Sequence, residues 1–455
     1  MGRLFAAIVT LCCTAGPLSV VLPNGAPAFA GPGHDVVPAV VPAAWTPAVN
    51  DGEVNALTQV GPTLVAGGTF TNVTPSGGAA RAVSGLVAFD ATTGAFVASF
   101  APQLNGTVDD VLPGPEPGTV LVAGRFTRVG SLAQSHVTLL DITTGDVVDG
   151  FRPATTNGRV TSLTMARGRL IIGGTFTAAG GQPHGGLAAL DPRSGALDPL
   201  MGVDLTGHHN DSGGGAQGPV GVKDMEATST GDKLAVIGNF KRADGLPRDQ
   251  LVVIDVGPDT ASVDVDWRTR RFEPYCYNWA FDTTMRGMAV SPDDSFFVVA
   301  STGGANPGTL CDSAARFDFD RSGEDVQPTW VDYSGGDTLW GVEITENAVY
   351  VGGHQRWMNN SEGRDSSGQG SVPRAGLAAL DPDSGLPLSW NPGRNPRGEA
   401  VYAIHATPTG VWIGSNTQWV GDRKYRRPRL AFFPIAGGAA PASDTTPPLP
   451  GEVYL

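Results

Sequence analysis

Short apolar runs of about five to seven residues recur along this chain between turns rich in Gly, Asp and Thr. The run Leu64–Phe70 returns in similar form at Leu121–Phe126 and Leu170–Phe176. The run Gly85–Asp90 returns at Val137–Asp141 and Gly186–Asp191, so the pattern repeats about every fifty residues. Runs of this length between turn residues predict β-strands, and no long stretch shows the periodicity of an amphipathic helix. Such a repeat is typical of a β-propeller, in which each repeat forms one blade.

The number of repeats follows from an aspartate at the end of the third apolar run. It occurs at Asp90, Asp141, Asp191, Asp255, Asp320 and Asp381. A seventh run, Leu430–Pro434, has the same form without the aspartate. A complete repeat holds four candidate strands, which in the first repeat span Val54–Gln59, Thr63–Thr71, Ser84–Asp90 and Phe96–Phe100. We therefore predict an all-β, seven-bladed β-propeller of four-stranded antiparallel blades.

Two residue patterns fit this architecture. In the turn from Asp90 to Gly94, the aspartate can accept hydrogen bonds from turn amides, and glycine can adopt the positive φ that closes a hairpin. A phenylalanine after the second strand of the first four repeats is expected to pack between blades. These residues are Phe70, Phe126, Phe176 and Phe240. Burying each ring contributes roughly 2–3 kcal/mol.

The two ends of the repeat region predict how the ring closes. Ala44–Pro47 resembles the end of a fourth strand, whereas the seventh repeat stops after its third strand near Gly438. We expect residues around Val40–Trp45 to supply the outer strand of the last blade, which would remove an open sheet edge.

The chain begins with the pattern of a secretory signal peptide. Arg3 provides positive charge, Leu4–Val21 is apolar, and Ala28–Ala30 has the small-residue form that signal peptidase cleaves. We predict a signal peptide over residues 1–30, a propeller over 31–438 and a disordered, Pro/Ala/Thr-rich tail over 439–455. The tail resembles a tether that precedes a further module.

Cysteine content agrees with export. Cys12 and Cys13 leave with the signal peptide, and Cys276 and Cys311 remain. In an exported protein these two are expected to form a disulfide, and the alternative is a pair of buried free thiols.

Charge narrows the classes of partner. The net charge is −14, which argues against nucleic-acid binding, because a polyanion requires a basic surface. The basic segment 423–429 is interpreted as a solvated loop. No segment after the leader reaches the roughly 18 apolar residues of a membrane span. We expect a secreted monomer without a cofactor.

The repeat carries a family resemblance. Apolar residues before Gly-Gly-x-Phe, an apolar-Asp-x-x-Ser/Thr-Gly turn and a following Phe-x-Pro are similar to the delta-sixty-repeat propellers of secreted bacterial proteins. Those are distantly similar to kelch propellers. The resemblance is good over repeats one to three, fair in repeat six and weak in the others. It implies a secreted propeller, supplies no catalytic residues that can be transferred to this chain, and leaves the function open.

Candidate ligand-binding residues lie in the long loops that are expected to share one face of the ring. They are His208, His209, Asp211, Tyr277, Trp279, Arg286 and His354. His208, His209 and Asp211 have metal-ligand chemistry, but adjacent histidines on a glycine-rich loop seldom face one ion, so no metal is predicted. Exposed aromatics such as Tyr277 and Trp279 suit the recognition of a sugar or a protein.

No nucleophile, zinc or phosphate-loop motif occurs. Consecutive carboxylates such as Asp109 and Asp110 are expected to point to opposite faces of a strand, which argues against a shared acid–base site. The sequence therefore favours a non-catalytic module that binds a glycan, an envelope component or a protein. Two alternatives stay open: a lyase or hydrolase with its site at the central channel, and a structural spacer.

Overall fold

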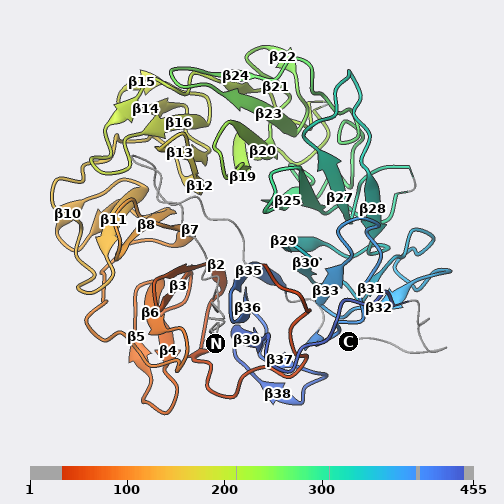
Figure 1. The fold of residues 1–455 in the computed structure, drawn as a ribbon. Helices are drawn as coiled ribbons and strands as arrows, with labels where there is room; N and C mark the ends of the chain where they lie inside the picture. The colour runs from red at the N-terminus through yellow and green to blue at the C-terminus, as the bar shows by residue number, and fades with distance from the viewer. Residues whose placement is uncertain (1–32, 212, 307, 396–399, 445–455) are drawn as a thin grey trace, which may run out of the picture.

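The computed structural model describes residues 33–211, 213–306, 308–395 and 400–444. These residues form antiparallel β-sheets and no α-helix, which confirms the all-β prediction. Seven larger sheets follow one another along the described chain, and Figure 1 shows them arranged around a common centre. The predicted signal peptide, residues 1–30, lies outside the described residues.

Each larger sheet starts with an inner strand that lies next to the centre (Figure 1). The inner strands are β2 (Val54–Val60), β7 (Val108–Pro113), β12 (Val160–Ala166), β19 (Gly221–Ala227), β25 (Met285–Val290), β29 (Leu339–Thr345) and β35 (Val401–Thr407). The second strands are β3 (Thr63–Gly68), β8 (Thr119–Gly124), β13 (Arg169–Gly174), β20 (Lys233–Asn239), β26 (Phe296–Ser301), β30 (Ala348–Gly353) and β36 (Gly410–Ser415). The third strands are β6 (Leu86–Asp90), β11 (Val137–Asp141), β16 (Leu187–Leu190), β23 (Leu251–Val256), β27 (Ser313–Asp318), β33 (Leu377–Leu380) and β39 (Leu430–Pro434).

The prediction of four strands in every blade is wrong in detail. A fourth strand occurs in three of the larger sheets, as β17 (Leu197–Asp198), β24 (Ala261–Val263) and β28 (Trp330–Tyr333). In the first sheet the expected strand Phe96–Phe100 is reduced to one bridge between Phe96 and Phe89. The chain leaves the sheet after that bridge, and Phe100 instead turns inward and is buried.

Small accessory sheets lie beside the larger ones. They are formed by β1 (Ala48–Val49), β4 (Asn72–Thr74) and β5 (Arg81–Ala82); β9 (Arg128–Val129) and β10 (Leu132–Ala133); β14 (Ala178–Ala179) and β15 (Gln182–Pro183); β18 (Leu205–Thr206), β21 (Arg242–Ala243) and β22 (Leu246–Pro247); β31 (Trp357–Met358) and β32 (Val372–Pro373); and β34 (Arg394–Asn395), β37 (Trp419–Val420) and β38 (Tyr425–Arg426).

The core lies between neighbouring sheets. One apolar cluster joins Val65 of β3 to Val108 and Val120 of the second sheet, and another joins Leu64 of β3 to Trp412 of β36. The phenylalanines predicted to pack between blades are all buried, with Phe70, Phe126, Phe176 and Phe240 at most 1 % exposed. Each sheet is therefore stabilised mainly by its neighbours, as expected for stacked repeats.

The Asp–Gly turn forms as predicted. Asp90 Oδ1 accepts hydrogen bonds from the Thr92 and Thr93 amides at 3.0 and 2.8 Å, and Gly94 has a φ of 68°. Bonds from the Thr92 and Thr93 hydroxyls, followed by these amides, lower the pKa of Asp90 to about 2. In the fifth sheet the repeat aspartate is Asp318, which ends β27 opposite Phe296, and the predicted Asp320 is exposed two residues beyond it.

The segment before β1 runs along the last sheet. The Ala39 and Ala43 amides donate hydrogen bonds to the Pro434 and Phe432 carbonyls of β39, both at 2.8 Å. The Trp45 ring contacts Trp412 of β36, with ring centroids 5.6 Å apart. The segment therefore adds backbone hydrogen bonds and an aromatic contact to the outer edge of that sheet.

The expectation of a disordered tail from residue 439 needs correction. Ala439 exchanges backbone hydrogen bonds with Val37 at 2.9 and 3.1 Å, and Ser443 bridges to Leu388. Asp444 forms an ion pair with the buried Arg374 at 2.8 Å. Residues 439–444 thus pack against the sheets, and residues 445–455 lie outside the described chain.

Candidate functional site

The same irregularity occurs in every inner strand. Each inner strand pairs with its second strand through a register shift near its first residues, so that one residue bulges out of the ladder. The bulged residues are Asn55, Asp109, Thr161, Lys223, Arg286, Trp340 and Tyr402. A bulge turns a side chain away from its regular direction, and bulges of this kind often border functional sites.

All seven bulged residues line one cavity of about 910 Å³. This wide cavity lies where the inner strands begin, on the face that carries the long loops between sheets. The repeat thus supplies one side chain per sheet to the wide cavity, and the chemistry of that side chain differs from sheet to sheet.

One side of the wide cavity is cationic. It holds Arg125, Arg159, Lys223 and Arg286. Arg159 forms an ion pair with Asp109, the bulged residue of the preceding sheet. Lys223 Nζ lies 3.8 Å from Asp282 Oδ2, and this is its one salt bridge to a described residue.

The surroundings of the wide cavity lower the pKa of two of its basic side chains. Burial lowers the pKa of Lys223, Asp282 raises it, and the nearby Arg286, Arg159 and Arg125 lower it further. Burial also lowers the pKa of Arg286 to about 10, with partial compensation from Asp282. The positive charge on the cationic side of the wide cavity is therefore incompletely balanced by acidic groups of the protein.

The opposite side is aromatic. The Trp340 and Tyr402 rings meet edge to face with centroids 5.3 Å apart. The Arg286 guanidinium lies 4.8 Å from the Trp340 ring centroid and joins this side to the cationic one. Glu53 lies near the Tyr402 hydroxyl, with 3.4 Å between the oxygens.

Below the bulges, carboxyl groups join neighbouring inner strands. Asp110 of β7 accepts a hydrogen bond from the Leu163 amide of β12 at 2.7 Å, and Asp224 of β19 accepts one from the Met288 amide of β25 at 2.9 Å. Burial is the main cause that raises the pKa of Asp110 to about 8 and that of Asp224 to about 6. These carboxyl groups hold adjacent sheets together along their inner strands.

A second, narrower cavity of about 460 Å³ lies where the inner strands end. Glu226, Glu343 and His405 line it among mostly apolar neighbours. The Glu226 and Glu343 carboxyls accept hydrogen bonds from the Val290 and Ala406 amides of the next inner strand, at 2.8 and 2.9 Å. Burial raises the pKa of each to about 8 and lowers that of His405 to about 4, so these three side chains are mostly uncharged at neutral pH.

The raised pKa of Glu343 predicts how stability depends on pH. The folded state holds this proton more tightly than the unfolded chain, so stability falls as pH rises from the ordinary pKa of 4.5 to about 8. Glu343→Gln keeps an acceptor for the Ala406 amide and removes the titration. Because water can enter the channel beside this half-buried side chain, we expect a gain of only about 1–2 kcal/mol over the wild type at pH 9 and little change at pH 5.

Urea unfolding at both pH values measures this effect. Glu346→Gln, at an exposed site three residues away, is the matched control and should follow the wild type. Equal pH dependence in the Glu343→Gln variant and the wild type would contradict the prediction.

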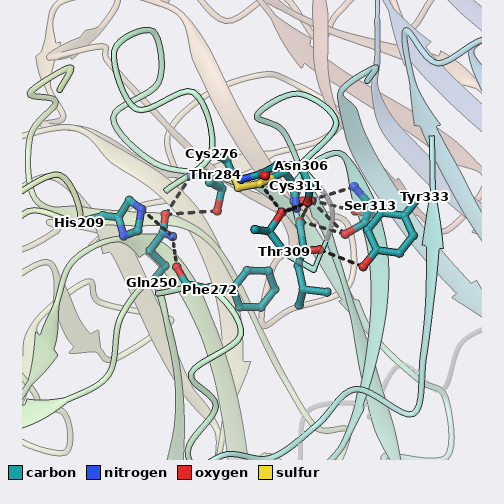
Figure 2. Close-up of a disulfide and its surroundings, with 12 residues drawn as sticks. His209, Gln250, Phe272, Cys276, Thr284, Asn306, Thr309, Cys311, Ser313 and Tyr333 are labelled. Carbon is teal, nitrogen blue, oxygen red and sulfur yellow. Dashed lines mark hydrogen bonds between the residues drawn. A yellow bond between two sulfur atoms is a disulfide. The ribbon is translucent and has the colours of Figure 1, made fainter. Parts of the chain in front are cut away.

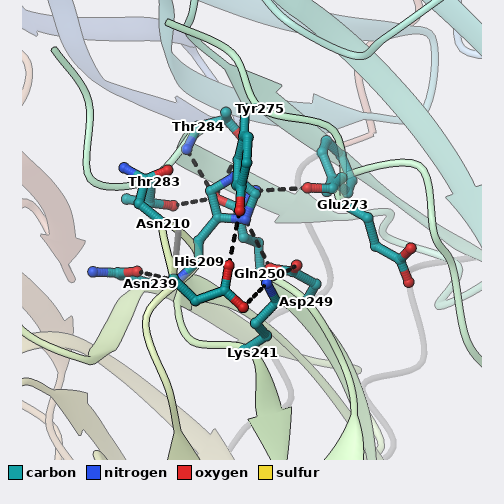
Figure 3. A network of polar contacts seen from close by, with 12 residues as sticks. His209, Asn210, Asn239, Lys241, Asp249, Gln250, Glu273, Tyr275, Thr283 and Thr284 are labelled. Carbon is teal, nitrogen blue, oxygen red and sulfur yellow. Dashed lines mark hydrogen bonds and ion pairs between the residues drawn. The ribbon is translucent and has the colours of Figure 1, made fainter. Parts of the chain in front are cut away.

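One residue of the predicted histidine cluster, His209, belongs to a buried network outside the wide cavity (Figure 3). His209 is 1 % exposed, its Nδ1 lies 2.8 Å from Asp249 Oδ1, and its ring meets Tyr275 edge to face. Gln250 Nε2 lies 3.3 Å from His209 Nε2 and also donates to the Phe272 carbonyl at 2.8 Å. The network ties two long loops to the fourth sheet.

The disulfide prediction is confirmed. Cys276 and Cys311 are bonded and buried, and Figure 2 shows the bridge beside Thr309 and Tyr333. The adjacent loop carries Tyr277 and Trp279, which are 53 % and 69 % exposed and have ring centroids 5.6 Å apart. A Cβ on Gly304 would lie 2.2 Å from the Tyr277 ring, so this glycine permits the close approach of the loop.

The structure separates the other predicted site residues. Arg286 lines the wide cavity, whereas His208, Asp211, Tyr277, Trp279 and His354 are outside its lining. Asp211 accepts a hydrogen bond from the Tyr275 hydroxyl at 2.8 Å and pairs with Lys241. The His354 amide donates a hydrogen bond to the Thr338 carbonyl. In the second sheet, the amide of Arg125, which lines the wide cavity, donates the equivalent hydrogen bond to the Thr107 carbonyl. Among the described residues, no group of three His, Cys, Asp or Glu side chains could hold a metal ion.

The expectation that Asp109 and Asp110 face opposite ways is wrong, because both line the wide cavity. The bulge at Asp109 interrupts the alternation of side chains along β7. Most of the cavity residues were missed for this reason. A signal was present: a variable polar or aromatic residue follows the first large apolar residue of each inner strand, as in Val222-Lys223 and Leu339-Trp340.

Comparisons with known proteins bear on the fold. Residues 168–200 match a family model described as a "Domain of unknown function (DUF5122) beta-propeller". These residues span β13, β16 and β17 of the third sheet and the accessory strands β14 and β15. A solved structure of the computationally designed Ika8 protein is similar over 88 % of this chain and 100 % of its own, at 13 % identity and a TM-score of 0.45. No curated protein sequence matches the chain. The family match supports a β-propeller.

Proposed function

We propose that this chain is a secreted, non-catalytic binding module whose ligand occupies the wide cavity. The bulge that recurs in all seven inner strands carries this proposal, because it turns seven chemically different side chains into one concave space. A rigid scaffold that presents variable residues at a cavity of this size suits ligand binding.

The proposal includes a seven-bladed ring closed by the chain's leading segment. Each inner strand contacts the next, and β35 contacts β2, which supports a continuous ring of seven blades. The hydrogen bonds from Ala39 and Ala43 to β39 support closure by that segment. The delta-sixty-repeat relationship stays a prediction.

A secreted location is compatible with two observations. The Cys276–Cys311 bridge suits an oxidising compartment. Among the described residues, no helix is long and apolar enough to cross a membrane. The leader peptide over residues 1–30 is part of the proposal.

Binding is favoured over catalysis because the cavity carboxyls already have partners in the fold. Asp110 and Asp224 each accept a backbone amide of the next inner strand, and Asp109 pairs with Arg159. The alternative of a lyase or hydrolase draws support from the pKa of about 6 for Asp224, a value that suits proton transfer near neutral pH.

A cavity-filling variant tests the proposed site. Thr175 lines the wide cavity, and Thr175→Trp should block it, whereas Thr155→Trp adds the same bulk at an exposed position outside the lining. In a thermal-shift screen against soluble glycans and envelope polysaccharides, we expect a ligand that stabilises the wild type and Thr155→Trp but not Thr175→Trp.

NMR spectra of that ligand during incubation separate binding from catalysis. Unchanged ligand supports the binding module, and steady conversion would favour the lyase or hydrolase. A ligand that still binds Thr175→Trp but fails to bind Trp279→Ala would move the site to the exposed aromatic loop and contradict the proposal.

A further inference from the structure

The wide cavity gathers four basic side chains beside four carboxyl groups, in a protein whose net charge is −14. Arg125, Lys223 and Arg286 come from the second, fourth and fifth sheets and line the same space. Arg125 forms no salt bridge with a described residue, and Lys223 forms only the long contact with Asp282. Such convergence of incompletely paired cations is unfavourable unless an anion joins them.

The carboxyl groups around the wide cavity have other partners, which leaves the positive charge of Arg125, Lys223 and Arg286 available to a ligand. Asp109 is engaged by Arg159, and Asp224 by the Met225 and Met288 amides. Asp110 accepts a hydrogen bond from the Leu163 amide. Glu53 lies on the aromatic side with Tyr402 and Asn416. Arg286 donates through Nη1 to the Thr283 and Met285 carbonyls, while its buried Nε has no hydrogen-bond partner.

The aromatic side indicates what else the anion carries. Trp340 and Tyr402 line the cavity beside Arg286, and their rings and polar ends suit the apolar face and hydroxyl groups of a sugar. A simple inorganic anion would contact the cationic side alone. A cavity of about 910 Å³ has room for a ligand that reaches both sides.

We propose that the wide cavity binds a saccharide that carries carboxylate groups, with a carboxylate toward Lys223 and Arg286 and a sugar ring against Trp340 and Tyr402. This inference rests on the proposed binding function and names the class of ligand. The carboxylate accepts charge-assisted hydrogen bonds from the two cations, and the sugar ring packs on the aromatic pair.

Calorimetric titration with trigalacturonic acid and with neutral galactotriose tests the inference on the full mature protein. We expect the acid to bind at least about tenfold more tightly than the neutral sugar, with affinity that falls as salt rises. Lys223→Met should weaken the acid about tenfold or more and leave any binding of galactotriose unchanged. Lys424→Met removes the same charge at an exposed site outside the cavity lining and should behave as the wild type.

Two outcomes would overturn the inference. If galactotriose binds as well as the acid, and Trp340→Ala but not Lys223→Met abolishes binding, the ligand is neutral and the proposed function survives. If neither saccharide binds the wild type, the acidic-saccharide class is wrong, and the Thr175→Trp screen decides separately whether the cavity is a binding site. Circular dichroism of each variant establishes that a lost titration signal reflects the site and not unfolding.

Discussion

Deletion of residues 33–46 is expected to lower the free energy of unfolding by more than about 5 kcal/mol, the largest effect we predict. The deletion removes the amides of Ala39 and Ala43 that bond β39, the buried Val37 and the Trp45 ring that covers Trp412. It also leaves β39 as an open edge, which invites association with other chains. Thermal unfolding and light scattering of the purified variant measure both consequences.

Two further experiments distinguish the loss of the proposed ring closure from the mere removal of residues. Val40→Ser with Val41→Ser changes side chains that are 47 % and 49 % exposed in the same segment and should leave stability within about 0.5 kcal/mol of the wild type. A synthetic peptide of residues 33–46 added to the deletion variant should restore stability in a concentration-dependent way. A deletion variant as stable as the wild type would refute closure by this segment.

Replacing both bridge cysteines, as Cys276→Ser with Cys311→Ser, is expected to cost about 3–4 kcal/mol. The bridge closes a loop with a sequence separation of 35 residues, so its loss frees the unfolded chain over that length. It also leaves two buried hydroxyls where both cysteines are almost fully enclosed. Urea unfolding under oxidising conditions measures the difference.

Reduction provides the control for this prediction. A reducing agent should lower the stability of the wild type toward that of the double variant and should have no effect on the variant itself. Limited proteolysis should cut the variant faster within residues 276–311. Equal stability of the two proteins under oxidising conditions would mean that the bridge contributes nothing beyond the packing of the loop.

Local chemistry explains which parts of the fold could be predicted. The turn after Asp90 is encoded by groups within four residues of each other, and it forms as expected. The interior position of Phe70 follows from its place at the end of an apolar strand. The pairing of Cys276 with Cys311 needed only the count of cysteines that follow the predicted signal peptide.

Errors arose where a residue's role depends on distant backbone. Asp320 and Asp318 both follow an apolar run, and only the pairing of β27 with β26 shows that Asp318 takes the repeat position. His209 lies in a glycine-rich stretch that suggested an open loop, yet Asp249 and Gln250 of another segment enclose it. Residues 439–444 have the composition of a linker but pair with Val37 and Leu388.

The candidate site likewise contains one residue that the sequence identifies and others that only the structure reveals. Arg286 was identified from the sequence, but Lys223, Trp340 and Tyr402 were not, because a regular strand would alternate its side chains between two faces. The bulge breaks that alternation through the register between the inner and second strands. The sequence signal is one polar or aromatic residue per inner strand, whereas the register shift itself depends on pairing with the second strand.

By itself, the sequence determined that this protein consists of short strands in a repeated, all-β arrangement with one disulfide, because strand length, turn chemistry and cysteine number are local properties. The tertiary structure alone decided which side chains share the wide cavity. Those residues lie about fifty to seventy positions apart and meet only because stacked sheets bring the starts of their inner strands around one centre.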